Sequence, residues 1–367
     1  MHVRAPALRR NLGRIRASVG AGVRLVPMVK ADAYGLGVAE AVRALKTEDP
    51  WGFGVAAVEE GLALRDMGVR RPVIVCSPVP PESILEAVAG DLTLTVSMAG
   101  TLGRLREAAA GTGRTAAFHL EVDTGMGRAG FDWRHADIWG PLAHEAHGAG
   151  ARWAGCYTHF HSADEGPETV HEQWRRFQEA LAAAAPPKEG FLVHAHNSAA
   201  ALRCPEYAGD AARPGIYLYG GHAGADQPAP EPVASVHARV VHTHTATAGD
   251  TVGYGSTYAA SGDERWATAS IGYGDGLPRA LGNRGQALVR GHRVPIIGRI
   301  SMDVTVVDIT GAPSVEVGDV VTFLGTDGDE RITVDEVAAQ VGTISYEVLT
   351  GFTPRLRRVW SSDEHGS

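Results

Sequence analysis

The sequence predicts an α/β barrel followed by a β domain: an N-terminal (β/α)8 TIM barrel at residues 1–225 and a C-terminal, mainly antiparallel β domain at residues 226–367. Two observations predict this fold class. Between positions 25 and 220, eight short apolar runs alternate with amphipathic segments whose apolar residues recur every three or four positions. Further along the chain, apolar and polar residues alternate with period two around Gly/Asp turns.

The eight apolar runs are the expected barrel strands. They lie at residues 25–30, 51–57, 72–77, 92–98, 116–123, 153–159, 191–197 and 216–220. The clearest helical segments between them are residues 58–68, 83–90, 101–111 and 171–185. Parallel strands need helical crossovers, and eight such units close a sheet into a barrel. An open doubly wound sheet is the competing architecture.

The second part of the chain begins after a linker rich in proline, glycine and alanine, residues 222–232. Its expected strands lie at residues 234–246, 265–274, 287–298, 303–309 and 319–325. Short strands with period-two alternation are typical of an antiparallel sheet. Only residues 333–340 have a helical pattern there.

Composition excludes several classes of protein. Of the 367 residues, 34 are Lys or Arg and 42 are Asp or Glu, and a net charge of −8 disfavours a nucleic-acid surface. No apolar run reaches the roughly 18 residues that a membrane span needs. The cysteines, Cys76, Cys156 and Cys204, are too scattered for a disulfide framework or a CxxC metal site. We therefore expect a cytoplasmic protein without nucleic-acid or membrane partners.

Polar residues gather where the expected barrel strands end, the rim at which barrels carry their reactive groups. Lys30 ends the first run, His159 the sixth and Asn197 the seventh, and Arg213 precedes the eighth. Burial lowers the pKa of a lysine and favours Schiff-base chemistry. In the alternative interpretation, Lys30 has no catalytic role and its amine reaches solvent or forms an ion pair with Asp32.

A phosphate site is also expected at this rim. Ser198 follows the seventh run, and Gly215 and Ile216 lie beside the eighth, where barrels commonly bind phosphate through backbone N–H groups and a hydroxyl. A phosphate anchor and a Schiff-base lysine at one rim together indicate pyridoxal phosphate.

Nine segments, in order and over nearly the whole chain, resemble the signature motifs of the alanine racemase family. They are VPMVKADAYGLG, VDTGMGRAGF, YTHFHSADE, HNSAAAL, RPGIYLYG, VGYGSTY, IGYGDGLPR, GRISMD and SYEVLT. The resemblance implies a homodimer with shared active sites, in which each barrel carries pyridoxal phosphate and each β domain completes the partner's site. It also implies a racemase that interconverts L- and D-alanine and supplies D-alanine.

The resemblance implies roles for the two bases and their neighbours. Lys30 would hold the cofactor and act as one base, and Tyr254 of the other subunit would act as the opposite base. A tyrosine with an ordinary pKa near 10 is a poor base at neutral pH, so His159 and Arg213 would tune it. Arg213 would keep the pyridine nitrogen neutral, because a guanidinium does not release its proton.

Further roles follow from the same resemblance. The phosphate would be held by Tyr34, Ser198, Gly215, Ile216 and Tyr346, and Asn197 would support the cofactor. The substrate would meet Arg128, Met302 and Asp303, and the entrance would be lined by Tyr273, Arg279 and Arg299. No metal is expected.

The sequence departs from the family at two points. Much of the family has a lysine, carbamylated to an anion, seven residues before the MGR arginine, where this chain has Glu121. We hypothesise that Glu121 supplies the negative charge that orients Arg128 directly. Strand alternation places Glu121 on the same face as His119 and Asp123. The second departure is Leu36 in place of the usual histidine.

Three other functions compete with this interpretation. A metal hydrolase could use the pairs His159-x-His161 and His194-x-His196, whose spacing places both side chains of a pair on one side of a strand. A barrel-type decarboxylase would share the lysine but would usually carry a cysteine motif in the β domain. A non-catalytic cofactor carrier would not need the β domain. Serine is an alternative substrate, because a methyl pocket rejects an added hydroxyl only weakly.

Overall fold

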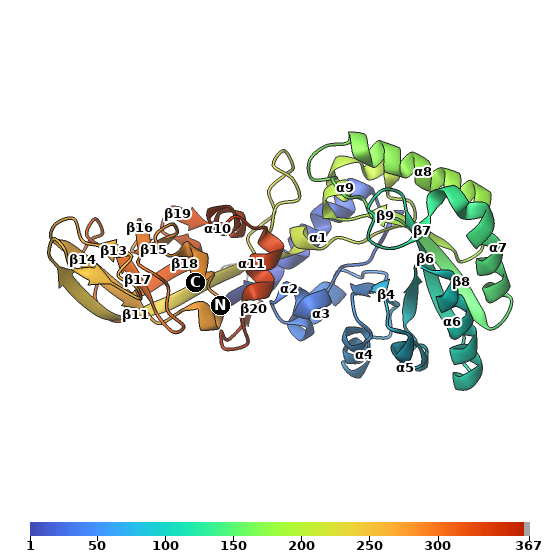
Figure 1. Ribbon diagram of the computed structural model, residues 1–367, viewed down its shortest axis with the longest axis horizontal. Coiled ribbons are helices and arrows are strands. Elements are labelled where there is room, and N and C mark those ends of the chain that lie inside the picture. Colours follow the sequence, from blue (N-terminus) through green and yellow to red (C-terminus); the bar gives the residue numbers. More distant parts are fainter. Residues whose placement is uncertain (363–367) are drawn as a thin grey trace.

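The computed structural model describes residues 1–362 as an elongated molecule of two lobes (Figure 1). The first lobe is built on eight parallel strands in the order β2-β10-β9-β8-β6-β5-β4-β3. Their bounds are Arg24–Leu25 (β2), Phe53–Val55 (β3), Val73–Pro78 (β4), Thr93–Val96 (β5), Ala116–Asp123 (β6), Ala151–Tyr157 (β8), Leu192–His196 (β9) and Ala211–Ala212 (β10). A short strand, β7 (Phe131–Asp132), pairs with β6.

The first and last strands of this order also join each other. Gly54 N–H donates to the carbonyl of Pro27 at 2.9 Å, and Val29 N–H donates to the carbonyl of Gly54 at 2.8 Å. These bonds link the chain after β2 to β3 and close the ring of strands. The predicted (β/α)8 barrel is therefore confirmed, and the open doubly wound sheet is excluded.

Helices surround the barrel on its outer side, except for the short segment α2, which lies at the rim of the cavity (Figure 1). They are α1 (Ala5–Val19), α2 (Lys30–Tyr34), α3 (Val38–Lys46), α4 (Val58–Asp66), α5 (Ile84–Ala89), α6 (Ala99–Thr112), α7 (Ala136–His147), α8 (Glu168–Ala184) and α9 (Ser198–Arg203), with 3-10 turns at η1 (Pro81–Ser83), η2 (Trp133–His135), η3 (Pro205–Tyr207) and η4 (Ile216–Tyr219). The longest, α8, buries Val170, Gln173, Phe177, Ala180 and Ala184. This spacing of three and four is the stripe that the sequence pattern predicts.

Two expected strands differ from the structure. Residues 216–220 form η4 and its cap, and the eighth strand is the shorter β10. All four residues of η4 are buried, and a short run that is apolar on every side does not distinguish a strand from a helical turn. Lys30 does not end a strand either, because it is the first residue of α2.

The second lobe is a β sheet in the order β19-β18-β15-β16-β17-β14-β11-β1-β20, and β18 also pairs with β11. The strands are β1 (His2–Arg4), β11 (Ala234–Ala246), β14 (Glu264–Ala269), β15 (Gln286–Val289), β16 (His292–Ile297), β17 (Thr305–Asp308), β18 (Val320–Asp327), β19 (Glu330–Ile332) and β20 (Val359–Ser361). All neighbours are antiparallel except β1 and β20, which confirms the mainly antiparallel prediction.

The second lobe also contains smaller elements. A hairpin is formed by β12 (Thr251–Val252) and β13 (Tyr258–Ala259), two 3-10 turns are η5 (Tyr273–Asp275) and η6 (Arg279–Leu281), and the helices are α10 (Val334–Val341) and α11 (Ser345–Gly351). The sequence predicts only the first of these helices. The second has just seven residues, too few for a clear helical period, and it buries Ser345, Val348 and Leu349.

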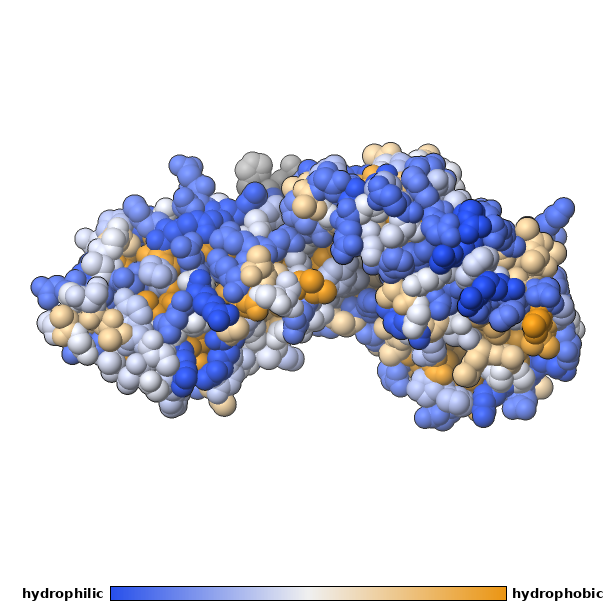
Figure 2. Space-filling view, turned by 45° about the horizontal axis from the view of Figure 1, so that its top comes forward, coloured by the Kyte–Doolittle hydropathy of each residue, from blue (hydrophilic) through white to orange (hydrophobic). Residues whose placement is uncertain are grey.

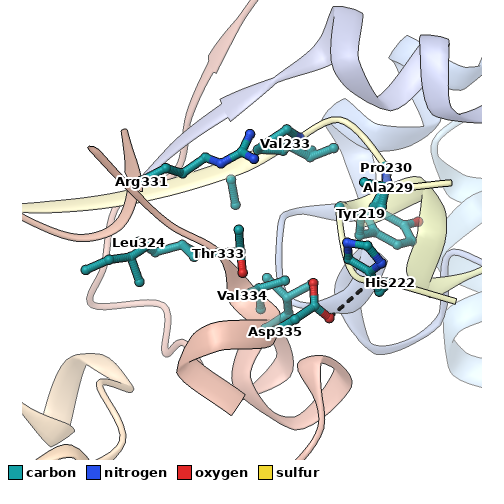
Figure 3. Close-up of a pocket in the computed structure, with 16 residues that line it drawn as sticks. Tyr219, His222, Ala229, Pro230, Val233, Leu324, Arg331, Thr333, Val334 and Asp335 are labelled. Atoms are coloured by element: carbon teal, nitrogen blue, oxygen red, sulfur yellow. Dashed lines mark hydrogen bonds between the residues drawn. The ribbon is translucent and has the colours of Figure 1, made fainter. Parts of the chain in front are cut away.

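The two lobes are held together by a continuous hydrophobic core and by specific hydrogen bonds. One cluster of buried residues includes both barrel and β-domain side chains. Figure 3 shows part of the junction, where His222 N–H donates to Asp335 Oδ1 at 3.1 Å. On another part of the junction, Trp360 Nε1–H donates to the carbonyl of Leu36 at 3.1 Å. Figure 2 shows the lobes side by side with mostly hydrophilic surfaces. Within residues 1–362, no helix has the length and apolar character for a membrane crossing.

Candidate active site

A cavity of about 680 Å³ lies at the carboxyl ends of the barrel strands. Ten of the residues that the sequence singles out line it together: Lys30, Tyr34, Arg128, His159, Asn197, Ser198, Arg213, Gly215, Ile216 and Tyr346. They come from loops after different strands, and Tyr346 comes from α11 of the β domain. The barrel thus brings one amine, two guanidinium groups, one imidazole and several hydroxyl groups to a single space.

Lys30 is followed by an unusual backbone conformation. Ala31, Asp32, Ala33 and Tyr34 have φ angles of 52°, 53°, 54° and 57°, so four consecutive residues other than glycine are left-handed. Each costs roughly 1–2 kcal/mol relative to the ordinary helical conformation. Strain of this kind persists only where the surroundings impose it, and it concentrates at functional sites.

Hydrogen bonds from neighbouring elements hold this left-handed turn, residues 31–34. Ala31 N–H donates to Glu60 Oε1 at 2.6 Å, and Asp32 Oδ1 accepts from Val38 N–H at 2.7 Å. Beyond the turn, the carbonyl of Gly35 accepts from Arg358 Nε at 3.0 Å and from its Nη2 at 2.8 Å. The turn therefore fixes where the Lys30 side chain starts.

Aromatic rings form the wall beside the lysine. Tyr34 stacks on Tyr219 at 4.5 Å between ring centroids, and Tyr346 lies 5.9 Å from Tyr34. Burial raises the pKa of Tyr346 to about 12 and raises the pKa of Tyr34 further. A Cβ on Gly215 would lie 2.1 Å from the Tyr34 hydroxyl, so only glycine fits there. Both tyrosines are therefore neutral hydrogen-bonding groups at neutral pH.

The start of α9 brings two polar side chains to the same wall. Asn197 caps the helix, since its side chain accepts from Ala200 N–H at 2.9 Å, and its Nδ2 donates to the carbonyl of Phe160 at 3.2 Å. Ser198 Oγ accepts from Gly215 N–H at 2.8 Å. This bond ties the loop after β9 to the loop after β10.

Arg213 is the buried cation of the site, with 5% of its surface exposed. Its guanidinium donates to the carbonyl of Thr158 at 3.1 Å and to Nδ1 of His194, and its Nη2 lies 3.5 Å from Nδ1 of His159. It also lies 4.8 Å from the ring centroid of Tyr157, a cation–π contact. These partners fix the guanidinium in one orientation.

His194, which is buried, supports the Arg213 guanidinium. His194 Nε2 lies 2.8 Å from Nδ1 of His119. Because an arginine can only donate, Nδ1 of His194 accepts, so Nε2 of this neutral ring carries the hydrogen and donates to His119. Arg213, His194 and His119 therefore form a chain of hydrogen bonds with one direction.

Buried neutral histidines make the stability of this protein depend on pH. Burial, aided by the charge of Arg213, lowers the pKa of His159 and His196 to about 3, and burial with Arg152 and Arg213 lowers that of His119 to about 3. An unfolded histidine has a pKa near 6.5, so below that pH the unfolded state binds more protons. We expect the free energy of unfolding to fall from pH 6.5 to 5, by up to about 1.4 kcal/mol per pH unit for each histidine.

Urea unfolding at pH 7, 6 and 5 measures this dependence. His196→Leu should reduce the slope, because burial lowers the pKa of His196 and no other described side chain bonds to its ring nitrogens. The exposed His292 provides the matched control, His292→Leu. Equal slopes in wild type and His196→Leu would contradict the assignment.

Glu121 lies next to the cavity and is 4% exposed. Its Oε2 accepts from Ser97 Oγ at 2.9 Å. Burial raises the pKa of Glu121, whereas the Ser97 and Tyr157 hydroxyls and the charges of Arg128 and Arg213 oppose that rise. Within residues 1–362 no direct ion pair joins Glu121 to Arg128, so the two groups interact through space.

The other β-domain residues that the sequence singles out form a separate group. Tyr254, Tyr273, Arg279, Arg299, Met302 and Asp303 are all exposed, and none of them lines the cavity of the same chain. Tyr254 lies in the β12–β13 hairpin, between Gly253 and Gly255, both with a φ of 74°. A Cβ on Gly255 would lie 2.6 Å from Arg299 Nη1, so the hairpin packs on that arginine.

Arg355 organises the neighbouring part of this group. Its guanidinium donates to Asp303 Oδ1 at 2.6 Å, to the carbonyl of Met302 at 3.0 Å and to both carboxylate oxygens of Asp275. Tyr273 N–H donates to the carbonyl of Ser301 at 3.0 Å. These bonds fix the loop that carries Met302 and Asp303.

Sequence reasoning missed several cavity and support residues. Cys76 lines the cavity, and burial raises the pKa of its thiol to about 11. Tyr157 lies two residues before His159 in the chain, and this strand spacing could have placed both on one face. His194 stood out only as a possible metal ligand, but its ring nitrogens are engaged by Arg213 and His119.

Comparisons with known proteins match both lobes of the chain. The family model "Alanine racemase, N-terminal domain" matches residues 3–223, and "Alanine racemase, C-terminal domain" matches residues 233–360. A curated alanine racemase of Syntrophobacter fumaroxidans is 36% identical over 93% of this chain and 92% of its own. A curated alanine racemase of Sorangium cellulosum is 39% identical over 91% of this chain and 90% of its own length.

Solved structures give the same result. The alanine racemase from Streptomyces coelicolor superimposes with a TM-score of 0.91 at 30% identity, covering 99% of this chain and 97% of that one. Both domains, their order and the barrel architecture are thus shared with these proteins. The chain belongs to the alanine racemase family.

Proposed function

We propose that this protein is a pyridoxal phosphate-dependent racemase that interconverts L- and D-alanine. The observation that carries the proposal is the convergence of Lys30, Arg128, His159 and Arg213 around one cavity in a chain of this family. Lys30 supplies the amine, and Arg128 supplies the positive charge that a substrate carboxylate requires.

The cavity residues fit the cofactor. Pyridoxal phosphate presents an aldehyde to an amine and a phosphate to hydrogen-bond donors. Among residues 1–362, Lys30 is the only lysine that lines the cavity. Ser198, Gly215 and Ile216, with the hydroxyls of Tyr34 and Tyr346, would hold the phosphate. The absence of a side chain at Gly215 lets the Tyr34 hydroxyl lie close to this backbone.

In the proposed mechanism the chain supplies bases and charge. When bound, pyridoxal phosphate supplies a conjugated ring that accepts the electron pair left by removal of the α-proton. Lys30 and Tyr254 would remove and return that proton on opposite faces, which racemisation requires. Arg128 would bind the substrate carboxylate, and Arg213 would donate hydrogen bonds without releasing a proton.

We also propose a homodimer with shared active sites. A base must reach the reacting atoms, yet Tyr254 is 71% exposed and belongs to the group outside the cavity of its own chain. Residues 1–225 would bind the cofactor, and residues 226–367, of which 363–367 lie outside the described residues, would complete the partner's site. Tyr273, Arg279 and Arg299 would line the entrance, and Met302 and Asp303 would face the substrate.

Mixing two inactive variants tests the shared site. In a dimer of one Lys30→Ala and one Tyr254→Phe subunit, one of the two sites would contain both native bases. Random subunit exchange should therefore restore about a quarter of the wild-type activity. Purified variants are unfolded together, refolded and assayed, with each variant treated alone as the control. A mixture that stays as inactive as its components would contradict a site shared between subunits.

Isotope exchange tests the reaction and the substrate. The holoenzyme is incubated with L-alanine, L-serine or other L-amino acids in D2O, and the enantiomers and their α-deuterium are resolved. We expect deuterium in both enantiomers of alanine, at a higher kcat/KM than for serine. Release of carbon dioxide would indicate a decarboxylase, and a preference for serine would correct the substrate.

Glu121→Ala is expected to raise the KM for alanine about tenfold and to change kcat less, because Arg128 loses a nearby opposite charge. Steady-state kinetics in both directions measures the effect. Glu121→Asp keeps the charge and should recover part of the affinity, and Ser97→Ala controls for loss of the hydrogen bond alone. Unchanged affinity and turnover in Glu121→Ala would remove this role.

A further inference from the structure

Three metal-ligand side chains converge on the outer surface of the barrel. They are His171 in the first turn of α8, Cys204 directly after α9, and Glu206 in η3. One donor atom from each lies within 4.8 Å of the others. Within residues 1–362 this is the only such group of three, and none of its members lines the cavity of the candidate active site.

The donor atoms of this group are not used elsewhere in the described part of the chain. No hydrogen bond or ion pair joins another described residue to the His171 ring nitrogens, the Cys204 sulfur or the Glu206 carboxylate. Cys204 is 1% exposed, whereas His171 and Glu206 are exposed to solvent. A buried thiol thus faces two adjustable ligands.

Aromatic side chains lie beside the imidazole. The Tyr207 ring meets His171 edge-on, with 5.6 Å between centroids and 89° between planes. Tyr207 is itself stacked on Trp174 at 5.4 Å. Because Tyr207 follows Glu206 directly, the same 3-10 turn positions the Glu206 ligand and contacts the His171 ring.

The local charge suits a cation. The charged groups that act on Cys204 are Glu206, Arg203 and Glu168. Arg203 is occupied, since its Nη1 donates to Asp226 Oδ2 at 2.7 Å and its Nε to the carbonyl of Ala163 at 2.7 Å. The two carboxylates therefore leave an excess of negative charge beside the thiol and the imidazole.

We propose that His171, Cys204 and Glu206 bind a zinc ion, with water as the fourth ligand. Thiolate, imidazole and carboxylate are the ligands that Zn²⁺ takes in proteins, at about 2.0–2.3 Å each, which places tetrahedral donors about 3.5 Å apart. The donors need to approach by about 1 Å, within reach of rotation of the two exposed side chains. The ion would join α8 to the end of α9, whose first residue, Ser198, lines the cavity.

Zinc titration of the metal-free holoenzyme tests the site. A competing chromophoric chelator should report one Zn²⁺ per chain with a dissociation constant below about 1 μM. Cys204→Ser and His171→Gln should each weaken binding by about 100-fold or more, since even the loss of a residue behind a ligand costs 10–100-fold. Co²⁺ in place of zinc should give a thiolate charge-transfer band that disappears in Cys204→Ser.

Matched variants separate this site from others. The exposed residues His292 and Glu189 provide the controls His292→Gln and Glu189→Gln, which should keep full affinity. Zinc should also raise the Tm of wild type and not that of Cys204→Ser. The proposal fails if wild type binds no zinc, if Cys204→Ser binds it equally well, or if Cys76→Ser in the cavity is the variant that loses it.

Discussion

Lys30→Ala is expected to lower racemase turnover by at least about 10⁴-fold, the largest effect of any single substitution in this chain. The substitution removes the only amine at the cavity, which in the proposed function both holds the cofactor aldehyde and serves as one of the two bases. The buried walls around it should remain folded, since Lys30 itself is only partly buried. Turnover is measured in both directions at saturating pyridoxal phosphate.

Covalent labelling identifies the lysine directly. The chain has only three lysines, Lys30, Lys46 and Lys188. Borohydride reduction of the holoenzyme, followed by peptide mass analysis, should place the cofactor on Lys30 alone, and Lys46→Ala and Lys188→Ala should label normally. A colourless protein that binds no cofactor, or a label on another lysine, would refute both the site and the proposed function.

Tyr254→Phe should lower turnover by about 10²–10⁴-fold, because it removes the proposed second base and keeps the ring. The remaining base should still exchange the α-proton of one enantiomer with solvent. We therefore expect that, in D2O, one enantiomer of alanine gains deuterium much faster than it inverts, whereas the other exchanges slowly. Separate measurements of exchange and inversion for each enantiomer provide this ratio.

An exposed tyrosine also offers a clean control. Tyr254 is largely exposed in the chain, so its replacement by Phe should leave the Tm unchanged. Tyr273→Phe removes a hydroxyl from the same surface at the proposed entrance and should change KM more than kcat. Near-normal rates in both directions for Tyr254→Phe would show that the second base is a different group.

The sequence predicts the fold well because periodicity reports burial. Spacing of three and four locates α8, and period-two alternation locates the antiparallel strands of the second lobe. The pattern fails for short elements that are buried on all sides, such as η4, and for α11, which is shorter than two full helical turns. In both cases tertiary packing decides the conformation, and the local periodicity of a single sequence does not report that packing.

Only part of the candidate site can be predicted from the sequence. Motifs point to Lys30 and Arg213, but the left-handed turn after Lys30 has no local signal, because alanine and aspartate ordinarily avoid that conformation in succession. The supports of Arg213 are equally hidden. His119 and His194 are 75 positions apart, and only the barrel closure brings their rings into contact.

The contact between Arg358 and the carbonyl of Gly35 has a consequence for how the chain matures during translation. Arg358 and Trp360, which secure Gly35 and Leu36, follow these residues by 323 and 324 positions in the chain. A nascent chain with every barrel strand already synthesised would still lack these donors. The residues after Lys30 therefore gain these hydrogen bonds only after the strands of both lobes that precede Arg358 have been synthesised.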